Sequence, residues 1–234
     1  MKYIDAHCHL SVSDASEIMS AGRDVGVVGA ICNSARMSDW TGVVDMCTRV
    51  KGVYGAVGVH PWHISDLPND WLDKLIDILH HNPDLMVGEI GLDKFYPDMS
   101  GQLDCFLCQL KAAYNLGRGV HMHCVGTWDK VLYILKNNQN ILPRFIIAHC
   151  YSGPVVQTKR LADLYNMYFS FSSRNISNVA RVLSVPLDRI LVESDSTDIA
   201  SVIDSVCKIS EILDIAPDKM ADIIYKNTLR ILRQ

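Results

Sequence analysis

The chain has 234 residues, and at about 150 residues per domain this length suits one large domain or two small ones. Hydrophobic residues make up 49% and charged residues 21%, which is the balance of a folded globular protein rather than a disordered chain. The 22 Lys and Arg residues against 26 Asp and Glu residues give a formal net charge of −4. That charge argues against bulk electrostatic binding of DNA or anionic lipid, although it still allows a local basic patch.

The amino terminus and the cysteines together predict a cytoplasmic protein. Asp5 and two histidines interrupt the first ten residues, where a signal peptide would need an unbroken apolar run. No apolar run reaches the roughly 18 residues that a membrane span needs, so we expect no membrane partner. The eight cysteines would suit a disulfide framework only in a small secreted chain. Several of them lie inside apolar runs, where reduced cysteine packs as a small hydrophobe.

Short β-rich runs alternate with longer segments of helical periodicity along the whole chain. The predicted strands are Tyr3–His7, Val25–Cys32, Gly55–His60, Leu85–Ile90, Gly119–His123, Phe145–His149, Tyr168–Ser172 and Arg189–Glu193. The predicted helices include residues 71–81, 102–117, 128–138 and 158–167, and Ser201–Leu232 predicts two more that are broken at Ala216-Pro217. Eight strands in 234 residues correspond to about 29 residues per repeat, the length of one βα unit.

No flexible linker or charge run interrupts this alternation, so we expect one domain over residues 1–234. The near-continuous apolar strands suit a parallel sheet, either open and doubly wound or closed as a barrel. Ligand-type residues end most of the strands, and these are His7, His9, His60, Glu89, His123, His149 and Asp195. An open sheet would hold these residues too far apart to converge, and the first turn lacks the expected G-x-G-x-x-G. The sequence therefore predicts an α/β fold, a (β/α)8 TIM barrel that could be slightly irregular.

His7 and His9 lie two residues apart at the end of a strand, so both side chains point to the same face. Two imidazoles in this position could bind one cation at about 2.1 Å each. An isolated pair could equally be two satisfied polar residues. Four further ligand-type residues at other strand ends strengthen the metal interpretation, and these are Glu89, His123, His149 and Asp195.

Glu89 lies between two glycines directly after an apolar strand, where an acid is costly to bury unless it is paired or bound to a cation. A carboxylate can bridge two metal ions about 3.5–4 Å apart, which a neutral imidazole cannot do. His123 and His149 end adjacent strands and could complete a second metal position. Asp195 could bind the first metal and take a proton from a bridging water.

His121 shares the face of His123 and competes for the same role, but the residue nearer the rim, His123, is the better ligand. His60 and His63 lie just beyond the third strand and could bind substrate or transfer a proton. A loop histidine and a proline turn would explain them equally well. Trp62 is the tryptophan best placed to line the mouth, although helix packing accounts for it too.

Four other residues adjoin the predicted ligands. Glu193 shares the face of Asp195 and would lie deeper in the barrel or orient a ligand. Cys8, Cys124 and Cys150 each follow or precede a predicted ligand. Strand alternation turns their side chains away from the metal face, so we expect packing roles rather than nucleophiles.

Six dispersed motifs occur in an order that resembles the TatD family of metal-dependent hydrolases, which are amidohydrolase-like barrels. The motifs are DAHCHL at 5–10, GVHPWH at 58–63, VGEIGLD at 87–93, AHCYSG at 148–153, PLDRILVESDS at 186–196 and NTLRIL at 227–232. By this resemblance His7, His9, Glu89 and Asp195 would hold one divalent ion, and Glu89, His123 and His149 would hold the other. The cofactors would then be one or two ions of Zn²⁺, Mg²⁺ or Mn²⁺.

The chain departs from the family pattern at two places that concern substrate binding. The family usually has an arginine two residues after the fifth-strand histidine, where this chain has Val125. It usually has a proline and a basic loop after the final aspartate, whereas Asp195 is followed by STDIASVIDS, which runs into a helix. The missing groups could grip a phosphate or a nucleic-acid strand.

The resemblance implies a 3′–5′ exodeoxyribonuclease that acts on DNA ends with a metal-activated water. In this interpretation Asp195 accepts the proton of the water, and His63 or His60 protonates the leaving group. The short loop and the acidic net charge favour an alternative, a metal-dependent hydrolase of a small amide, ester or lactone or of a D-aminoacyl-tRNA ester. A third interpretation is a non-catalytic barrel that uses the metal for stability or binds a partner. The oligomeric state is not readable from the sequence.

Overall fold

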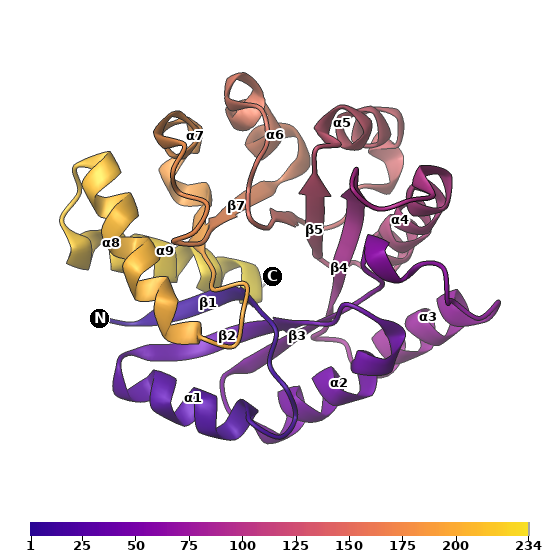
Figure 1. Ribbon diagram of the computed structural model, residues 1–234, viewed down its shortest axis with the longest axis horizontal. Coiled ribbons are helices and arrows are strands. Elements are labelled where there is room, and N and C mark those ends of the chain that lie inside the picture. The colour runs from indigo at the N-terminus through magenta and orange to yellow at the C-terminus, as the bar shows by residue number, and fades with distance from the viewer. Residues whose placement is uncertain (234) are drawn as a thin grey trace.

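The computed structural model describes residues 1–233 and contains eight parallel strands enclosed by helices (Figure 1). The strands are β1 (Tyr3–Cys8), β2 (Val27–Asn33), β3 (Val53–Val57), β4 (Met86–Asp93), β5 (Val120–Val125), β6 (Ile146–Ala148), β7 (Met167–Phe171) and β8 (Ile190–Val192). The α-helices are α1 (Ala15–Asp24), α2 (Trp40–Arg49), α3 (Trp71–His81), α4 (Met99–Asn115), α5 (Trp128–Asn137), α6 (Thr158–Tyr165), α7 (Val179–Ser184), α8 (Val202–Leu213) and α9 (Pro217–Leu232). Within the described residues, no helix combines the length and the apolar character needed to cross a membrane.

The strands pair in chain order from β1 to β8, and the barrel closes through an irregular seam. Within residues 1–233 no strand ladder joins β8 to β1. Instead, the N–H of Asp195 donates to the carbonyl of His7 at 2.9 Å, and the N–H of His9 donates to that of Ser196 at 3.2 Å. The carboxylate of Asp5 also accepts the N–H of Ser194 at 3.0 Å. The predicted, slightly irregular (β/α)8 barrel is confirmed.

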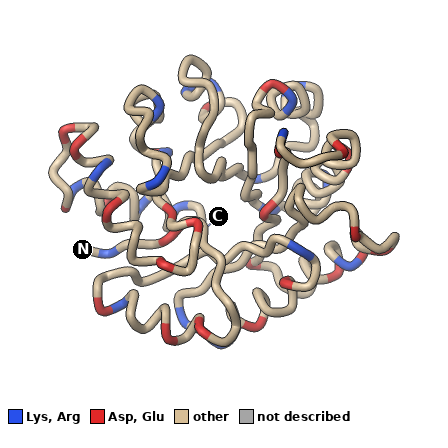
Figure 2. Tube along the Cα trace, in the orientation of Figure 1, with Lys and Arg blue, Asp and Glu red and all other residues tan. Residues whose placement is uncertain are grey.

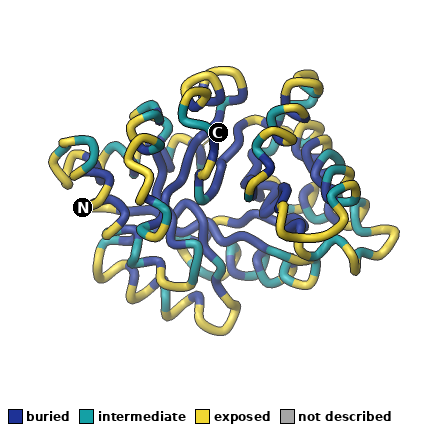
Figure 3. The backbone as a smooth tube through the Cα atoms, turned by 45° about the horizontal axis from the view of Figure 1, so that its top comes forward, coloured by how far each residue is buried: buried dark blue, intermediate teal, exposed yellow. Residues whose placement is uncertain are grey.

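The barrel interior is apolar at its floor and polar towards the carboxyl ends of the strands. Side chains alternate across a strand, so residues two apart point the same way. In β6, Ile147 lies two positions before His149, and in β8, Leu191 lies two positions before Glu193. The floor consists of buried side chains that include Ala6, Ile31, Ala56, Met86, Phe145, Ile147, Tyr168 and Leu191. Figure 3 shows these strands as a buried inner layer within more exposed helices.

The third strand ends earlier than the sequence predicts, at Val57 rather than His60. Beyond Val57, side chains from other elements form the hydrogen bonds with the backbone N–H and carbonyl groups. The carbonyl of Gly58 accepts the indole N–H of Trp40 at 2.8 Å and the hydroxyl of Ser34 at 3.1 Å. The side-chain amide of Gln109 bonds both the N–H and the carbonyl of Val59, at 2.8 and 3.1 Å. These contacts aim the following loop at the barrel mouth.

The fourth strand needs glycine at position 91, because the strand lies directly against β5 there. Gly91 pairs with His123 in the parallel register and has a φ of 151°. A Cβ atom at this position would collide with the carbonyl of His123. Glycine has no Cβ and adopts this backbone without cost. The close approach brings Glu89 of β4 beside His123 of β5.

The last two helices are separated where the sequence predicts a break. Pro217 is the first residue of α9, a position where its missing N–H costs no intrahelical bond. The buried amide of Asn227 in α9 donates to the carbonyls of Leu187 and Ile190, both at 2.9 Å. This side chain therefore fastens the helix to the start of β8.

Replacing Asn227 by Ala should lower the free energy of unfolding by about 1–3 kcal/mol, because the buried carbonyl of Ile190 and the part-buried carbonyl of Leu187 lose the donor that Asn227 supplies. Urea denaturation monitored by circular dichroism would measure it. Lys226→Ala is the matched control, since its ion pair with Asp222 at 2.6 Å is exposed and contributes under about 0.5 kcal/mol. Equal losses in the two variants would contradict the role given to Asn227.

Candidate metal centre

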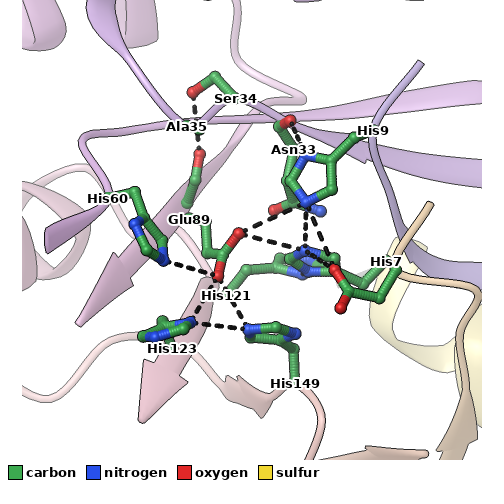
Figure 4. Close-up of polar contacts among 12 residues, drawn as sticks. His7, His9, Asn33, Ser34, Ala35, His60, Glu89, His121, His123 and His149 are labelled. Carbon is green, nitrogen blue, oxygen red and sulfur yellow. Dashed lines mark hydrogen bonds and ion pairs between the residues drawn. The ribbon is translucent and has the colours of Figure 1, made fainter. Parts of the chain in front are cut away.

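The structure brings together the six residues that the sequence predicts as metal ligands (Figure 4). They come from the three strands β1, β4 and β5 and from the segments that follow β1, β6 and β8. They are His7, His9, Glu89, His123, His149 and Asp195. The Glu89 side chain is 5% exposed and lies at the centre of the group.

One set of donor atoms surrounds Oε2 of Glu89. The Nε2 atoms of His7 and His9 lie 3.3 and 3.6 Å from this oxygen and 3.2 Å from each other. Oδ1 of Asp195 lies 3.9 Å from Nε2 of His7 and 3.5 Å from Nε2 of His9. Glu89 and Asp195 thus each place an oxygen within 4 Å of both imidazole nitrogens, and the four donors come from three segments of the chain.

A second set of donor atoms surrounds Oε1 of Glu89. Nδ1 of His123 lies 2.9 Å from this oxygen and Nε2 of His149 lies 2.8 Å from it. The two imidazole nitrogens are 3.1 Å apart. Nε2 of His60 lies 3.4 Å from the same oxygen, so His60 belongs to the cluster as well.

The hydrogen bonds on the far side of two imidazoles show that these donor sets suit cations. His9 donates its Nδ1–H to the carbonyl of Asn33 at 3.0 Å, which leaves the lone pair of Nε2 facing the cluster. His123 donates its Nε2–H to Asp93 at 3.2 Å, which leaves the lone pair of Nδ1 facing the carboxylate of Glu89. A lone pair facing a carboxylate is unfavourable unless a proton or a metal ion lies between them.

The distances between donor atoms also fit a shared ion. Ligand atoms about 2.1 Å from one ion lie about 3.0 Å apart in octahedral and about 3.4 Å apart in tetrahedral geometry. The separations of 3.2–3.9 Å in the first set and 2.8–3.1 Å in the second are close to these values. The cluster is therefore able to bind metal, with Glu89 contributing one oxygen to each set.

Electrostatics hold Glu89 in its charged form despite its burial. Burial alone raises the pKa of this carboxyl group, but the charges of His149 and His7 and the hydrogen bond from His149 outweigh it. The pKa of Glu89 consequently lies well below its usual value. Burial lowers the pKa of His149, yet the charge of Glu89 dominates and raises that pKa well above its usual value.

His9 and Asp195, on the more exposed side of the cluster, also have pKa values that neighbouring charges shift against the effect of burial. Burial lowers the pKa of His9, but its hydrogen bond with Asp195 and the charge of Glu89 raise that pKa to about 9. Burial raises the pKa of Asp195, and its hydrogen bond with His9 and the charges of His149 and His7 lower it to about 2. Without a metal ion, protons on His9 and His149 thus balance the charges of Glu89 and Asp195.

Asp93, to which the sequence analysis gave no role, is the acid that orients His123. Its Oδ2 accepts the Nε2–H of His123 at 3.2 Å and the indole N–H of Trp62 at 2.8 Å. Its Oδ1 accepts the N–H of Phe95 at 2.9 Å. Burial raises the pKa of Asp93, and these hydrogen bonds outweigh it and lower the pKa below its usual value. Its place four residues after Glu89, on the same strand face, was the signal that could have identified it.

Glu193 is fully buried below the cluster and holds the turn that carries His149. Its Oε1 accepts the N–H of Cys150 at 2.6 Å, and its Oε2 accepts the hydroxyl of Ser170. The same Oε1 lies 3.8 Å from Nδ1 of His149. Of the two places that the sequence allowed for Glu193, the structure shows the deeper one, from which it supports the His149 turn.

The expectation that Cys150 points away from the metal face is wrong. Cys150 has a φ of 40° and Asp195 has a φ of 50°, so neither residue continues the alternation of its strand. The Sγ atom of Cys150 lies 3.7 Å from Oδ2 of Asp195. Burial raises the pKa of this thiol to about 12, so it is protonated at neutral pH. Cys8 and Cys124 do point away, towards the carbonyl of Ile31 and the hydroxyl of Thr127.

The remaining histidines of the sequence analysis occupy different positions. His121 is buried below the cluster, with its Nδ1 3.4 Å from Nδ1 of His7 and its Nε2 without a hydrogen-bond partner in the described residues. His63 lies outside the cluster, and its ring centroid is 6.4 Å from that of His60. Burial and the charge of Arg36 lower the pKa of His63. Trp62 lies at the edge of the cluster, bound to Asp93.

Comparisons with known proteins identify the family of the chain. The model of the family described as TatD related DNase matches residues 4–233. The uncharacterized metal-dependent hydrolase YjjV of Escherichia coli is 27% identical over 212 residues, covering 84% of this chain and 80% of that protein. The 3′-5′ ssDNA/RNA exonuclease TatD of Klebsiella pneumoniae is 24% identical over 192 residues, covering 78% of this chain and 72% of that protein.

Solved structures show the same fold. The crystal structure of YjjV from Escherichia coli matches with a TM-score of 0.87 at 23% identity, covering 99% of this chain and 98% of that one. A TatD family hydrolase from Entamoeba histolytica matches with a TM-score of 0.85 at 16% identity, with the same coverage of both chains. Because the family model spans the barrel from β1 to the end of α9, the chain belongs to the TatD-related DNase family of metal-dependent hydrolases.

Proposed function

We propose that the protein is a divalent-metal-dependent 3′–5′ exodeoxyribonuclease that acts on the ends of single-stranded DNA. The observation that carries this proposal is the carboxylate of Glu89, which presents one oxygen to each of two donor sets. Two ions held about 3.5–4 Å apart by such a carboxylate are a common arrangement in enzymes that cleave phosphodiesters. The relative from Klebsiella pneumoniae, named as a 3′-5′ ssDNA/RNA exonuclease, supports the same reaction.

We assign His7, His9, Glu89 and Asp195 to the first ion and Glu89, His123 and His149 to the second, in keeping with the distances above. The ions would be Zn²⁺, Mg²⁺ or Mn²⁺, and the number of imidazoles favours Zn²⁺ or Mn²⁺. When bound, they would lower the pKa of a water towards about 7 and polarise the scissile phosphoryl group. We expect this chemistry to take place in the cytoplasm.

The chain supplies its own groups for proton transfer. Asp195 would accept the proton of the attacking water, because its side chain is 33% exposed and its Oδ1 lies 3.5 Å from Nε2 of His9 in the first donor set. The proton for the leaving oxygen would come from His63 or His60. His63 is the freer of the two, since Nε2 of His60 already lies 3.4 Å from Glu89.

Cations near the mouth favour a substrate that carries phosphate. Exposed Arg174 donates from Nη2 to the carbonyls of Ser194 and Asp195, at 2.8 and 3.3 Å, which places its guanidinium beside the proton acceptor. Its other N–H groups can bind a phosphate oxygen. The side chain of Lys94 lies over Gly126, next to Val125, where the family usually has arginine. Figure 2 otherwise shows acidic and basic residues interspersed, with no continuous basic band in this view.

The same ions could also hydrolyse a small amide, ester or lactone or a D-aminoacyl-tRNA ester. The net charge of −4 favours this alternative, because it gives little long-range attraction for DNA. The two candidates differ in whether Arg174 is needed, since a small neutral ester offers no phosphate to bind.

Purified protein with Mg²⁺, Mn²⁺ or Zn²⁺ should remove nucleotides from the 3′ end of labelled single-stranded DNA. Asp195→Asn should slow this by about 10²–10⁴-fold, because it removes the proton acceptor. Gel electrophoresis of the timed products measures both rates. If wild type stays inert on DNA while binding metal, the nuclease proposal fails and small esters and aminoacyl-tRNA become the substrates to test.

Replacing Arg174 by Ala should raise KM for DNA by about tenfold or more, because a charge-assisted hydrogen bond to phosphate contributes about 1.5–3 kcal/mol. Arg174→Lys should recover part of the loss, and KM for a neutral ester should not change. Lys159→Ala on α6 is the control, since this exposed cation forms an ion pair with Asp163 at 3.1 Å on the helix surface. An equal rise in KM from both alanine variants would show a general charge effect instead.

Binding of the metal ions should release protons and weaken as the pH falls. His9, with a pKa of about 9 in the metal-free chain, carries a proton at neutral pH that an incoming ion must displace. Calorimetric titration at pH 7.5 in two buffers of different ionisation enthalpy should therefore show net proton release, and the release due to His9 should vanish above pH 9. Heats that do not depend on the buffer would contradict this charge state.

A further inference from the structure

Two aromatic side chains form an exposed stacked pair at the edge of the metal centre. Trp62 follows β3 and Tyr96 follows β4, and their ring centroids are 5.2 Å apart with an angle of 15° between the ring planes. Trp62 is 46% exposed and Tyr96 is 40% exposed. Stacking alone does not require two such large rings to be so open to solvent, so the exposed surface is available to a ligand.

The pair is fixed to the metal centre by a short chain of hydrogen bonds. The indole N–H of Trp62 donates to Oδ2 of Asp93 at 2.8 Å, and the same oxygen accepts the Nε2–H of His123 at 3.2 Å. The ring of Trp62 also lies edge to face with that of His60, with centroids 4.9 Å apart. A flat group resting on the pair is therefore adjacent to the donor atoms around Glu89.

The indole N–H of Trp62 already has a hydrogen-bond acceptor within the protein. This single N–H donor is bound to Asp93, so the indole offers a ligand its face rather than a hydrogen bond. The neighbouring residue Phe95 is 76% exposed, and the ammonium group of Lys94 lies over its ring, 4.7 Å from the ring centroid. The surface beside the centre thus combines flat apolar faces with one cation.

We propose that Trp62 and Tyr96 form a stacking platform for a base within the last nucleotides of the DNA strand, so that its 3′ phosphodiester lies over the metal centre. This inference rests on the proposed nuclease function and names the part of the substrate that binds. Every base has a flat face, so stacking tolerates any sequence. Because the N–H of Trp62 is occupied, the platform reads no base edge and gives little preference among the four bases.

The test uses single-stranded oligonucleotides in which an abasic residue replaces each of the last three nucleotides in turn. Cleavage with metal gives kcat and KM, and fluorescence anisotropy of a 5′-labelled strand in EDTA gives binding without turnover. In the wild-type protein, one abasic position should weaken binding and raise KM by about tenfold. In Trp62→Leu and Tyr96→Ala, intact DNA should bind about as weakly as the abasic strand, with less than about twofold between them.

Matched variants separate stacking from other roles of these residues. Trp62→Phe keeps an aromatic face but loses the bond to Asp93, and Tyr96→Phe keeps its ring, so both should bind within about threefold of wild type. Tyr133→Ala removes a 70% exposed tyrosine on α5 and should change nothing. Circular dichroism confirms that each variant is folded.

The outcomes of these experiments distinguish failure of the stacking platform from failure of the nuclease function. If wild type cleaves DNA but no abasic position matters, the platform is wrong and the nuclease function stands. If Trp62→Phe loses as much binding as Trp62→Leu, the contribution comes from Asp93 and not from stacking, which also overturns the platform. If wild type neither binds nor cleaves DNA in the presence of metal, both proposals fall together.

Discussion

The burial of one carboxylate among imidazoles is the constraint on which the rest of the site depends. An isolated charged carboxylate is very costly to bury, and Glu89 is 4% exposed. It stays charged because His7, His123 and His149 face its two oxygens from three other segments of the chain. Such an arrangement requires the strand ends to meet on one rim, which a closed barrel provides and an open sheet does not. The seam between β8 and β1 carries Asp195 to the same point.

A second layer of contacts determines which atom of each side chain faces the centre. The carbonyl of Asn33 takes the Nδ1–H of His9, and Asp93 takes the Nε2–H of His123, so the free nitrogens are directed inward. Glu193 holds the backbone N–H of Cys150 and thereby the turn that ends in His149. Ligand histidines commonly depend on such partners for their tautomer and orientation. The geometry is thus built into the chain before any ion arrives.

The fold and most of the donor atoms followed from local patterns, whereas several details depended on distant partners. Period-two spacing placed His7 beside His9, and strand-end residues predicted the shared rim. The early end of β3 could not be predicted, because it requires Ser34, Trp40 and Gln109 to capture the backbone of residues 58 and 59. The position of Cys150 arises from a left-handed backbone that has no signature in the sequence around it. His60 and Asp93 lie within the motifs GVHPWH and VGEIGLD, but only the folded chain shows that they face Glu89 and His123.

The loss of family elements around the mouth changes how such a centre would recognise a strand. With Val125 in place of an arginine and a short segment after Asp195, few cations remain to follow a phosphate backbone. Arg174 and Lys94 reach the rim from two other loops, and the pair of Trp62 and Tyr96 adds apolar faces. Many Lys and Arg contacts with phosphates make DNA affinity fall steeply with salt concentration. Affinity depends less on salt concentration when it comes from base stacking and from metal ions at the reacting phosphate. Under the proposed function, a chain of net charge −4 would therefore bind the end of a DNA strand without a surface that attracts the whole strand.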